Sequence, residues 1–237
     1  LFELHNELKT GVYKPQPYIK FIVRDPKERI IHKANVRDRI VHQLIYDYLL
    51  PIFEKRFIFD SYSSRTGKGT HRAVKRLQTF CHKISSNNKQ SCWILKCDIK
   101  KFFDSIDHDI LFSFIKKRID NPLVLEIISK VIKSYEIGPN KGLPLGNLTS
   151  QLFANIYLHE FDYFIKHVLH MKYYIRFNDD FIIAYSRKSF LELQKICSQG
   201  SEGLANDAQC FLRNFYLQYH RRWNIGSVCD DRYVGRN

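Results

Sequence analysis

Two adjacent carboxylates, Asp179 and Asp180, lie in the middle of an otherwise apolar run that extends from Tyr173 to Ala184. The apolar flanks predict two strands, and Asn178 with Asp179 makes a suitable tight turn between them. Like charges this close repel each other, so without a cation at least one carboxyl is expected to shift toward its protonated form. A divalent metal would resolve that conflict. The run therefore predicts a hairpin that holds Mg²⁺ for phosphoryl transfer.

A third carboxylate strengthens this interpretation. Asp98 ends the apolar segment 92–97, and Asp107 is the expected N-cap of a helix over 108–118. We expect Asp98 to meet the acidic pair on an adjacent strand of one sheet. Mg²⁺ takes only a few protein oxygens and completes its shell with water and substrate phosphates. An Asp-Asp pair alone is more often part of a solvated turn, and a single acid at a strand end more often has no catalytic role. It is the combination of the two that favours a metal-binding site.

Composition limits the remaining possibilities. The 237 residues carry a net charge of +14, which predicts a polyanionic partner whose binding weakens as salt rises. The hydrophobic content of 44% is enough for a packed core, yet no run of about 18 apolar residues predicts a membrane span. The chain opens with Leu-Phe-Glu-Leu-His and has no signal-peptide pattern, so we expect a fragment that begins inside a longer protein.

The six cysteines contain no Cys-x-x-Cys pair, so a zinc site is not expected. We expect reduced thiols and a cytoplasmic location, in a protein encoded by a bacterium or a phage. The cysteines are Cys81, Cys92, Cys97, Cys197, Cys210 and Cys229.

The elements before the acidic segments have their own signals. Residues 1–17 are predicted to be a polar lead-in, and residues 18–32 a hairpin flanked by Arg24 and Arg29. The apolar spacing predicts helices over 37–54, 71–86, 122–135 and 147–169. In the first of these, Ile40, Leu44, Tyr48 and Ile52 recur every four residues.

A glycine-containing loop lies between the first two of these helices. Gly67 and Gly69 surround Lys68, and Arg65 precedes them. Glycine lets backbone N–H groups approach a phosphate closely, so the loop is a candidate phosphate cradle, although its spacing is not that of a Walker A loop.

In this order the segments resemble a reverse transcriptase. The resemblance covers about residues 18–195 and implies an α/β (α+β) fold with right-hand fingers and palm, the antiparallel palm sheet flanked by helices. The matching segments are Phe21–Thr70 for the fingers motifs, Cys97–Phe103 for the first palm motif, Gly142–Gln151 for the template and primer motif, and Phe177–Asp180 for the Tyr-x-Asp-Asp box.

The resemblance implies three regions. Residues 1–90 would form the fingers with their lead-in, and residues 91–195 the palm. Residues 196–237 do not resemble the primer grip and thumb, and they contain no lysine. We therefore expect an atypical tail from a frameshift or a truncated gene; a thumb in another reading frame would support this hypothesis.

The resemblance also implies a metal site. Asp98 and Asp179 would be the principal ligands, Asp180 would support them, and the carbonyl of Ile99 would be a further ligand. Two Mg²⁺ ions about 3.5–4 Å from each other, with Mn²⁺ as an alternative, would clamp the attacking and leaving oxygens during in-line displacement.

Nucleotide contacts are implied by five positions. Phe103 would act as a steric gate against a ribose 2′-OH, which predicts a preference for deoxynucleotides. Arg24 and Arg29 resemble fingers residues that hold the incoming triphosphate. Leu145 and Gly146 would lie beside the nucleotide.

Template and primer contacts are implied by another five positions: Arg65, Lys68, Asn147, Gln151 and Phe177. Arg65 and Lys68 are expected mainly to support the template or the structure of the fingers. Phe177 stands where the family box has tyrosine, so the ring is kept and one hydroxyl is lost.

Two departures from the common family pattern bear on fidelity. Leu145 stands where the pattern has Gln, and Gln151 where it has Pro. Both resemble the enzymes of diversity-generating retroelements, which copy RNA with frequent errors at adenines and act with a small basic accessory protein. Loss of an orienting amide weakens discrimination between correct and incorrect pairs.

Several alternatives remain open. Group II intron-like and defence-type bacterial reverse transcriptases share these motifs, and a catalytically impaired nucleic-acid-binding remnant is a different class. Phe103 disfavours an RNA-dependent RNA polymerase. The expected partners are an RNA template, a DNA or RNA primer and dNTPs, with no membrane.

Overall fold

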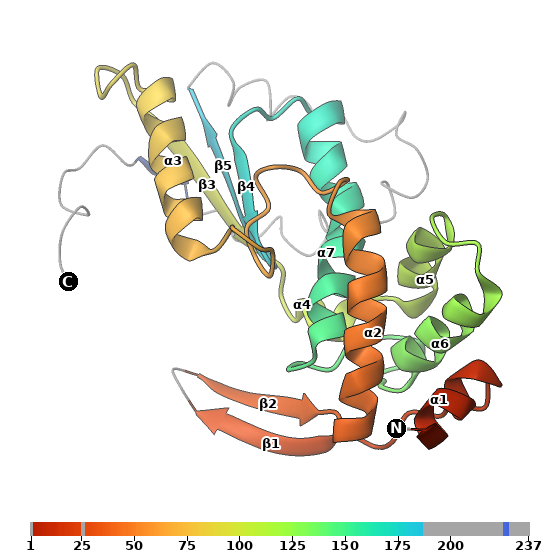
Figure 1. Cartoon of the computed structure of the whole chain (residues 1–237). Helices are drawn as coiled ribbons and strands as arrows, with labels where there is room; N and C mark the ends of the chain where they lie inside the picture. Colours follow the sequence, from red (N-terminus) through yellow and green to blue (C-terminus); the bar gives the residue numbers. More distant parts are fainter. Residues whose placement is uncertain (1, 25–26, 187–224, 228–237) are drawn as a thin grey trace. The chain divides into compact units, whose positions relative to one another are not determined.

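The computed structural model describes residues 2–24, 27–186 and 225–227. The expected mixed α/β architecture with antiparallel sheets is confirmed (Figure 1). Within these described residues, every helix is too short or too polar to cross a bilayer.

The chain divides into two compact units. The first contains Leu1–Phe57 and Lys101–His159, and the second contains Ile58–Lys100 and Glu160–Asn237. The units interleave along the chain, whereas the expected fingers and palm regions follow one another in sequence. That functional division stays a prediction.

In the first unit, β1 (Ile19–Arg24) and β2 (Glu28–Lys33) form the predicted antiparallel hairpin. Every residue of β1 is exposed, so the hairpin projects from its unit. The helix α2 (Val36–Phe53) follows, and the side chain of Asn35 caps it by accepting a hydrogen bond from the backbone N–H of Arg37.

The periodicity of α2 predicts the helix but not the face that packs. Ile40, Leu44 and Tyr48, which recur every four residues, are 37%, 54% and 43% exposed. A second apolar stripe, shifted by one residue, is buried instead; it comprises Val41, Ile45 and Leu49. Both stripes have helical spacing, so tertiary packing alone decides between them.

Helix α1 (Phe2–Lys9) was not predicted, because residues 1–17 were expected to be only a polar lead-in. Leu4 is its buried side chain, and one buried residue gives no apolar period. Glu7 forms an ion pair with Arg37 at the start of α2. This contact links residues distant in sequence, which explains why the sequence pattern missed the helix.

The other predicted helices are present, with ends within a few residues of those expected. Asp107 caps α5 as predicted, accepting hydrogen bonds from the N–H groups of Asp109 (3.0 Å) and Ile110 (3.1 Å). The predicted apolar stripe from Phe153 to Ile165, carried by α7 and the π-helical turn after it, is buried. The predicted elements are α3 (Thr70–Ile84), α5 (His108–Lys116), α6 (Pro122–Lys133), and α7 (Leu148–Tyr163) with the π-helical turn η1 (Phe164–Val168). The short helix α4 (Phe102–Ser105) was not predicted.

The second unit is built on a four-stranded antiparallel sheet in the order β4-β5-β3-β6. Its strands are β3 (Trp93–Asp98), β4 (Tyr174–Phe177), β5 (Asp180–Tyr185) and β6 (Ile225–Ser227). The sequence predicted the first three. The strand β6 lies within the expected atypical tail, 196–237, whose other residues lie outside the described residues.

Two helices cover this sheet. Ala73 and Phe80 of α3 pack in one cluster with Ile175 of β4, and α3 lies along the strands (Figure 1). Phe161 of α7 packs against the ring of Tyr174, the neighbouring residue of β4. Because successive side chains of a strand point to opposite faces, α3 and the end of α7 cover opposite faces of the sheet.

The cysteines of the described residues are Cys81, Cys92 and Cys97, and all three are free thiols as predicted. Burial raises the pKa of Cys97 to about 12, which fits a small core residue. Cys197, Cys210 and Cys229 lie outside the described residues.

A fully buried ion pair joins β4 to α7. Arg176 donates from Nε to Asp162 Oδ1 over 2.8 Å and from Nη2 to Oδ2 over 2.7 Å, and both side chains are 0% exposed. The hydroxyl of Tyr174 donates to Asp162 Oδ1 over 2.7 Å. The pair is therefore bidentate, and a third donor adds to it, which is the arrangement that a buried carboxylate needs.

We expect Arg176→Met to lower the free energy of unfolding by about 3–5 kcal/mol, because it leaves the Asp162 carboxylate buried without its counter-ion. The double variant Arg176→Met/Asp162→Leu should recover part of that loss. Urea denaturation followed by circular dichroism measures both. Lys96→Met, at an exposed position of the same sheet, is the control and should cost less than about 1 kcal/mol. Equal losses for the two single variants would contradict the assigned role of the pair.

Candidate active site

The antiparallel pairing of β3 with β5 places Asp98 directly opposite Asp180. Asp179 occupies the turn just before Asp180. Directly paired residues of antiparallel strands have Cα atoms about 4.5–5.5 Å apart and share one face of the sheet. The predicted meeting of Asp98 with the acidic pair on adjacent strands is therefore confirmed.

The turn that carries Asp179 is a two-residue hairpin loop. Phe177 and Asp180 form the closing pair, and Asn178 has φ = 57°, a left-handed conformation that asparagine tolerates better than most residues. Arg176 Nη1 donates to the carbonyl of Asn178 over 3.1 Å. The N–H of Ile99 donates to the carbonyl of Asp179 over 3.3 Å. Both neighbouring strands thus hold the loop.

The electrostatics at the turn match the predicted conflict. Burial raises the pKa of the Asp179 carboxyl above its usual value, and the charges of Asp98 and Asp180 raise it further. The side chain of Asn178 donates to Asp179 Oδ1 over 3.0 Å, which opposes that rise. The half-exposed Asp180 forms an ion pair with the exposed Lys96 at 4.0 Å. Among the described residues, no basic side chain forms an ion pair with Asp98 or Asp179.

The donor set fits Mg²⁺. Carboxylate oxygens and a backbone carbonyl such as that of Ile99 are hard ligands, which Mg²⁺ prefers. In the part of the chain that the structure describes, no three His, Cys, Asp or Glu side chains are grouped closely enough to hold a metal ion by themselves, and the three aspartates are no exception. Mg²⁺ bound here would therefore need substrate phosphates and water to complete its shell.

The predicted nucleotide-binding residues lie in the first unit. Arg24 forms an exposed ion pair with Glu28 across the hairpin (3.4 Å), and Arg29 pairs with Val23 in the β1–β2 register. Phe103 is half-buried in α4, and its ring packs against that of Phe102 at 5.5 Å.

A short segment joins Phe103 to the hairpin within this unit. The N–H of Leu143 donates to the carbonyl of Phe103 over 2.8 Å, and the N–H of His32 donates to the carbonyl of Leu145 over 2.9 Å. The structure therefore brings Phe103, Leu145 and strand β2 together, as a shared nucleotide site would require.

Gly146 and Asn147 fasten this segment to β2. Gly146 has φ = 103°, and a Cβ there would lie 2.5 Å from Cγ2 of Ile31, so glycine is required. The buried amide of Asn147 donates to the carbonyl of His32 over 2.8 Å and accepts from the N–H of Ala34 over 3.2 Å. Its observed partners are thus backbone groups of this unit, and its predicted template contact stays a prediction.

The loop with Arg65 and Lys68 belongs to the second unit, as does Phe177. Arg65 Nη1 donates to the carbonyls of Ile58 (2.7 Å) and Ser61 (2.9 Å). Lys68 Nζ donates to the carbonyl of Phe59 over 2.7 Å. Both side chains hold the loop together, and their predicted role toward the template or the fingers stays a prediction.

The remaining predicted template residues, Gln151 and Phe177, differ in exposure and belong to different units. Gln151 is exposed on α7 in the first unit, and Phe177 is half-buried beside the acidic turn in the second. Their predicted contacts with template or primer stay predictions.

Sequence reasoning missed the role of Arg176. Its side chain reaches the carbonyl of Asn178 from inside the protein and is itself held by Asp162. The available signal was a basic residue in an otherwise apolar strand, since such a residue is seldom buried unless paired.

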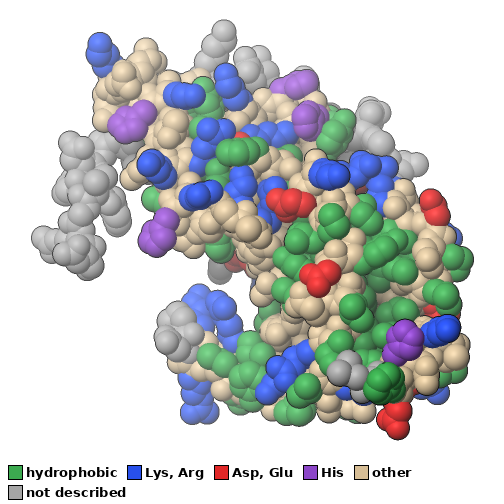
Figure 2. Space-filling model, in the orientation of Figure 1, with side chains coloured by type: hydrophobic (Ala, Val, Ile, Leu, Met, Phe, Trp, Pro, Cys, Tyr) green, Lys and Arg blue, Asp and Glu red, His purple; other side chains and the backbone are tan. Residues whose placement is uncertain are grey.

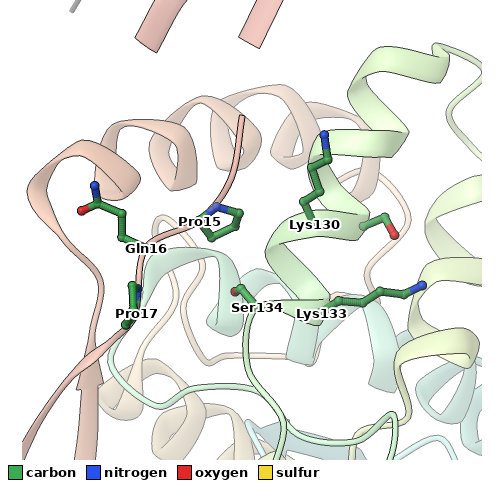
Figure 3. A pocket seen from close by; sticks show the side chains of 7 residues that line it. Pro15, Gln16, Pro17, Lys130, Lys133 and Ser134 are labelled. Carbon is green, nitrogen blue, oxygen red and sulfur yellow. The ribbon is translucent and has the colours of Figure 1, made fainter. Parts of the chain in front are cut away.

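An open cavity of about 550 Å³ lies elsewhere in the first unit (Figure 3). Its lysine Lys130 already pairs with Glu126 at 2.6 Å. No predicted site residue lines it; the lining residues are Pro15, Gln16, Pro17, Ser129, Lys130, Lys133 and Ser134.

The family model described as reverse transcriptase (RNA-dependent DNA polymerase) matches residues 19–207. Because this match spans more than half of the sequence, the chain belongs to the reverse transcriptase family. The match also extends beyond residue 195, where the motif resemblance ended.

Curated relatives include proteins encoded by group II introns. The chain is 30% identical over 167 residues to the group II intron-encoded protein LtrA of Lactococcus lactis subsp. cremoris, covering 67% of this chain and 27% of LtrA. It is 28% identical over 173 residues to protein YkfC of Escherichia coli (strain K12), covering 68% of this chain and 44% of YkfC. The chain thus spans less than half the length of these relatives.

Solved structures show the same fold. Telomerase from Candida tropicalis, in complex with a fragment of telomeric RNA, aligns with a TM-score of 0.56 and 16% identity over 85% of this chain and 42% of that one. Telomerase from Candida albicans gives a TM-score of 0.55 and 13% identity, over 78% of this chain and 39% of that one. These similarities agree with the expected fingers and palm fold.

Because Asp179 lies beside other carboxylates, both its substitution and added Mg²⁺ should change the melting temperature of the protein. We expect Asp179→Asn to raise the melting temperature slightly without Mg²⁺, because it removes a charge that faces like charges, worth roughly 0.2–1 kcal/mol. Mg²⁺ should raise the melting temperature of the unmodified protein, since it binds the folded state, and should have little effect on the variant. Differential scanning fluorimetry with and without Mg²⁺ measures both.

The exposed residue Asp120 provides a matched control, because Asp120→Asn removes the same charge far along the sequence from the turn. This variant should keep the full response to Mg²⁺. A response that Asp179→Asn also keeps would refute a metal site at the hairpin.

Proposed function

We propose that this chain carries the polymerase centre of an RNA-directed DNA polymerase, which extends a primer 3′-OH with dNTPs on an RNA template. The observation that carries the proposal is the register that sets Asp98 against Asp180, with Asp179 in the turn between β4 and β5. Membership of the reverse transcriptase family supports it.

The reaction would be an in-line attack of the primer 3′-OH on the α-phosphate, with pyrophosphate leaving. Asp98, Asp179, Asp180 and the carbonyl of Ile99 would hold two Mg²⁺ ions. When bound, the ions would lower the pKa of the attacking hydroxyl and offset the charge that develops on the transferred group. The chain's own part is to fix its carboxylates: strand pairing holds Asp98, and contacts from Arg176 and Ile99 hold the turn.

Substrate selection would fall to the first unit. Arg24 and Arg29 supply exposed cations on the β1–β2 hairpin for the triphosphate. The ring of Phe103 would collide with a ribose 2′-OH, so dNTPs are the proposed substrates. Leu145 is tied to the hairpin through His32, which gives the segment near the nucleotide a fixed position.

For the finer class we propose the low-fidelity enzyme of a diversity-generating retroelement, acting with a small basic accessory protein in the cytoplasm of a bacterium. Leu145 and Gln151 support this class, because neither reproduces the common family pattern. The named intron-encoded relatives favour a second candidate, a group II intron-like enzyme. Fidelity distinguishes the two.

Primer extension tests the main proposal. With Mg²⁺, dNTPs and a primed RNA template, the chain should extend the primer, and Asp179→Asn should abolish extension because a principal metal ligand is lost. Asp120→Asn serves as the control and should extend normally. Denaturing gels of a labelled primer measure the products.

Two other results would contradict the proposal. Salt-sensitive RNA binding without any extension would identify a catalytically impaired remnant. Preferential incorporation of ribonucleotides would identify an RNA polymerase instead, and would refute the role given to Phe103.

The proposed membership of the diversity-generating retroelement class predicts a characteristic error spectrum. Sequenced products should carry errors clustered opposite template adenines, and Leu145→Gln should reduce them by restoring an orienting amide beside the nucleotide. Leu145→Met, which restores no amide, is the matched control and should leave the errors unchanged. Equal error rates in Leu145→Gln and the unmodified protein would argue against the retroelement class.

A further inference from the structure

Helix α3 is basic along its whole length and contains no acidic residue. The described helices α1, α2, α5 and α6 each carry both signs of charge, so a helix of 15 residues without an acid differs from them. Its basic and histidine residues are His71, Arg72, Lys75, Arg76, His82 and Lys83.

Packing fixes which side of α3 faces outward. Ala73, Phe80 and Ile84 are buried, the first two against Tyr62 and Ile175 and the third against Cys92 and Ala184. With 3.6 residues per turn, residues 72, 75, 79, 82 and 83 fall on one stripe on the other side. We call the side chains of Arg72, Lys75, His82 and Lys83 the basic face.

Among the described residues, no carboxylate forms an ion pair with a side chain of the basic face. Arg76, at the margin of the stripe, pairs with the buried Asp60 at 2.9 Å, and Arg72 donates to the carbonyl of Gly67. Lys75 and Lys83 are exposed and form no ion pair with any described residue. Figure 2 shows lysine, arginine and histidine side chains gathered over α3.

The basic face begins near the acidic turn of the same unit and extends away from it. Near its start, α3 follows a segment in which the N–H of Tyr62 donates to the carbonyl of Arg176 over 2.9 Å, close to the turn. Its last residue, Ile84, packs with Ala184, at the opposite end of β5 from Asp180. The basic face thus runs along the sheet away from the acids.

From Arg72 to Lys83 the basic face is about 16 Å long at 1.5 Å per residue. Each strand of a DNA duplex carries a phosphate about every 3.4 Å of helix axis, and on that scale a face of this length lies beside several phosphates. The residues of the stripe are Arg, Lys, His and Thr, whereas the exposed Val74 of the same helix lies outside the stripe. Charge complementarity therefore favours a polyanionic backbone as the partner.

We propose that the basic face of α3 binds the phosphate backbone of the RNA outside the catalytic site. The assignment to RNA rests on the proposed function, whereas the assignment to phosphates rests on the face itself. Contacts of this kind are independent of sequence and lengthen the time that RNA stays bound.

The test is the affinity for a single-stranded RNA of mixed sequence, measured by fluorescence anisotropy over a range of salt concentrations. Lys75→Glu/Lys83→Glu should weaken binding about tenfold and reduce the salt slope by roughly 1.4, because two phosphate contacts are lost. Both positions are exposed, so folding should persist, and circular dichroism checks it.

The control is Lys9→Glu/Lys116→Glu, which changes the net charge equally at exposed helix positions of the first unit. It should bind RNA nearly as the unmodified protein does. Equal weakening by both double variants, or no weakening by Lys75→Glu/Lys83→Glu, would overturn the proposal. A loss of affinity confined to single-stranded DNA would overturn the assignment to RNA.

Kinetics separate this inference from the proposed function. Lys75→Glu/Lys83→Glu should raise the KM for template RNA about tenfold and leave kcat unchanged. Asp179→Asn should abolish extension and leave RNA affinity unchanged. A chain that binds RNA through the basic face but never extends a primer would refute only the polymerase proposal.

Discussion

The buried ion pair between Arg176 and Asp162 is the interaction on which the acidic turn depends. Its guanidinium satisfies a fully buried carboxylate with two nitrogens and donates to the carbonyl of Asn178 with the third. One side chain therefore links the core helix α7 to the loop that carries Asp179. The loop has only two residues and little conformational freedom. Holding the carbonyl of Asn178 therefore also restricts the direction of the Asp179 carboxylate.

Local patterns were enough to predict the elements and the site's acids. The apolar flanks and the Asn178 turn identified the hairpin, and the strand ending in Asp98 identified its neighbour. Pairing these strands followed from the chemistry, because three acids near one another need a shared cation. Asp107 was likewise identifiable, since an N-cap acts on the two or three residues that follow it.

Features decided by contacts between distant residues could not be predicted in the same way. The sequence of α2 contains two stripes of helical spacing, and only packing selects Val41, Ile45 and Leu49 for the core. Gly146 needs to be glycine because Ile31, far away in sequence, occupies the space of a Cβ. In the sequence, Arg176 is a single basic residue in an apolar strand, and only the structure shows that Asp162 is its partner.

Some acidic side chains of the second unit have a basic partner and others have none, and this difference argues for a function at the β4–β5 hairpin. Asp162 is neutralised by Arg176, and Asp60 by both Arg76 and Lys166. The protein therefore has the means to compensate buried acids and an excess of 14 positive charges with which to do so. The exposed Asp98 and the half-buried Asp179 nevertheless have no such partner among the described residues. Burial, and to a smaller extent the charges of Asp98 and Asp180, raise the pKa of Asp179. Leaving two carboxylates uncompensated costs stability, and a cation supplied with the substrate is the simplest reason to retain them.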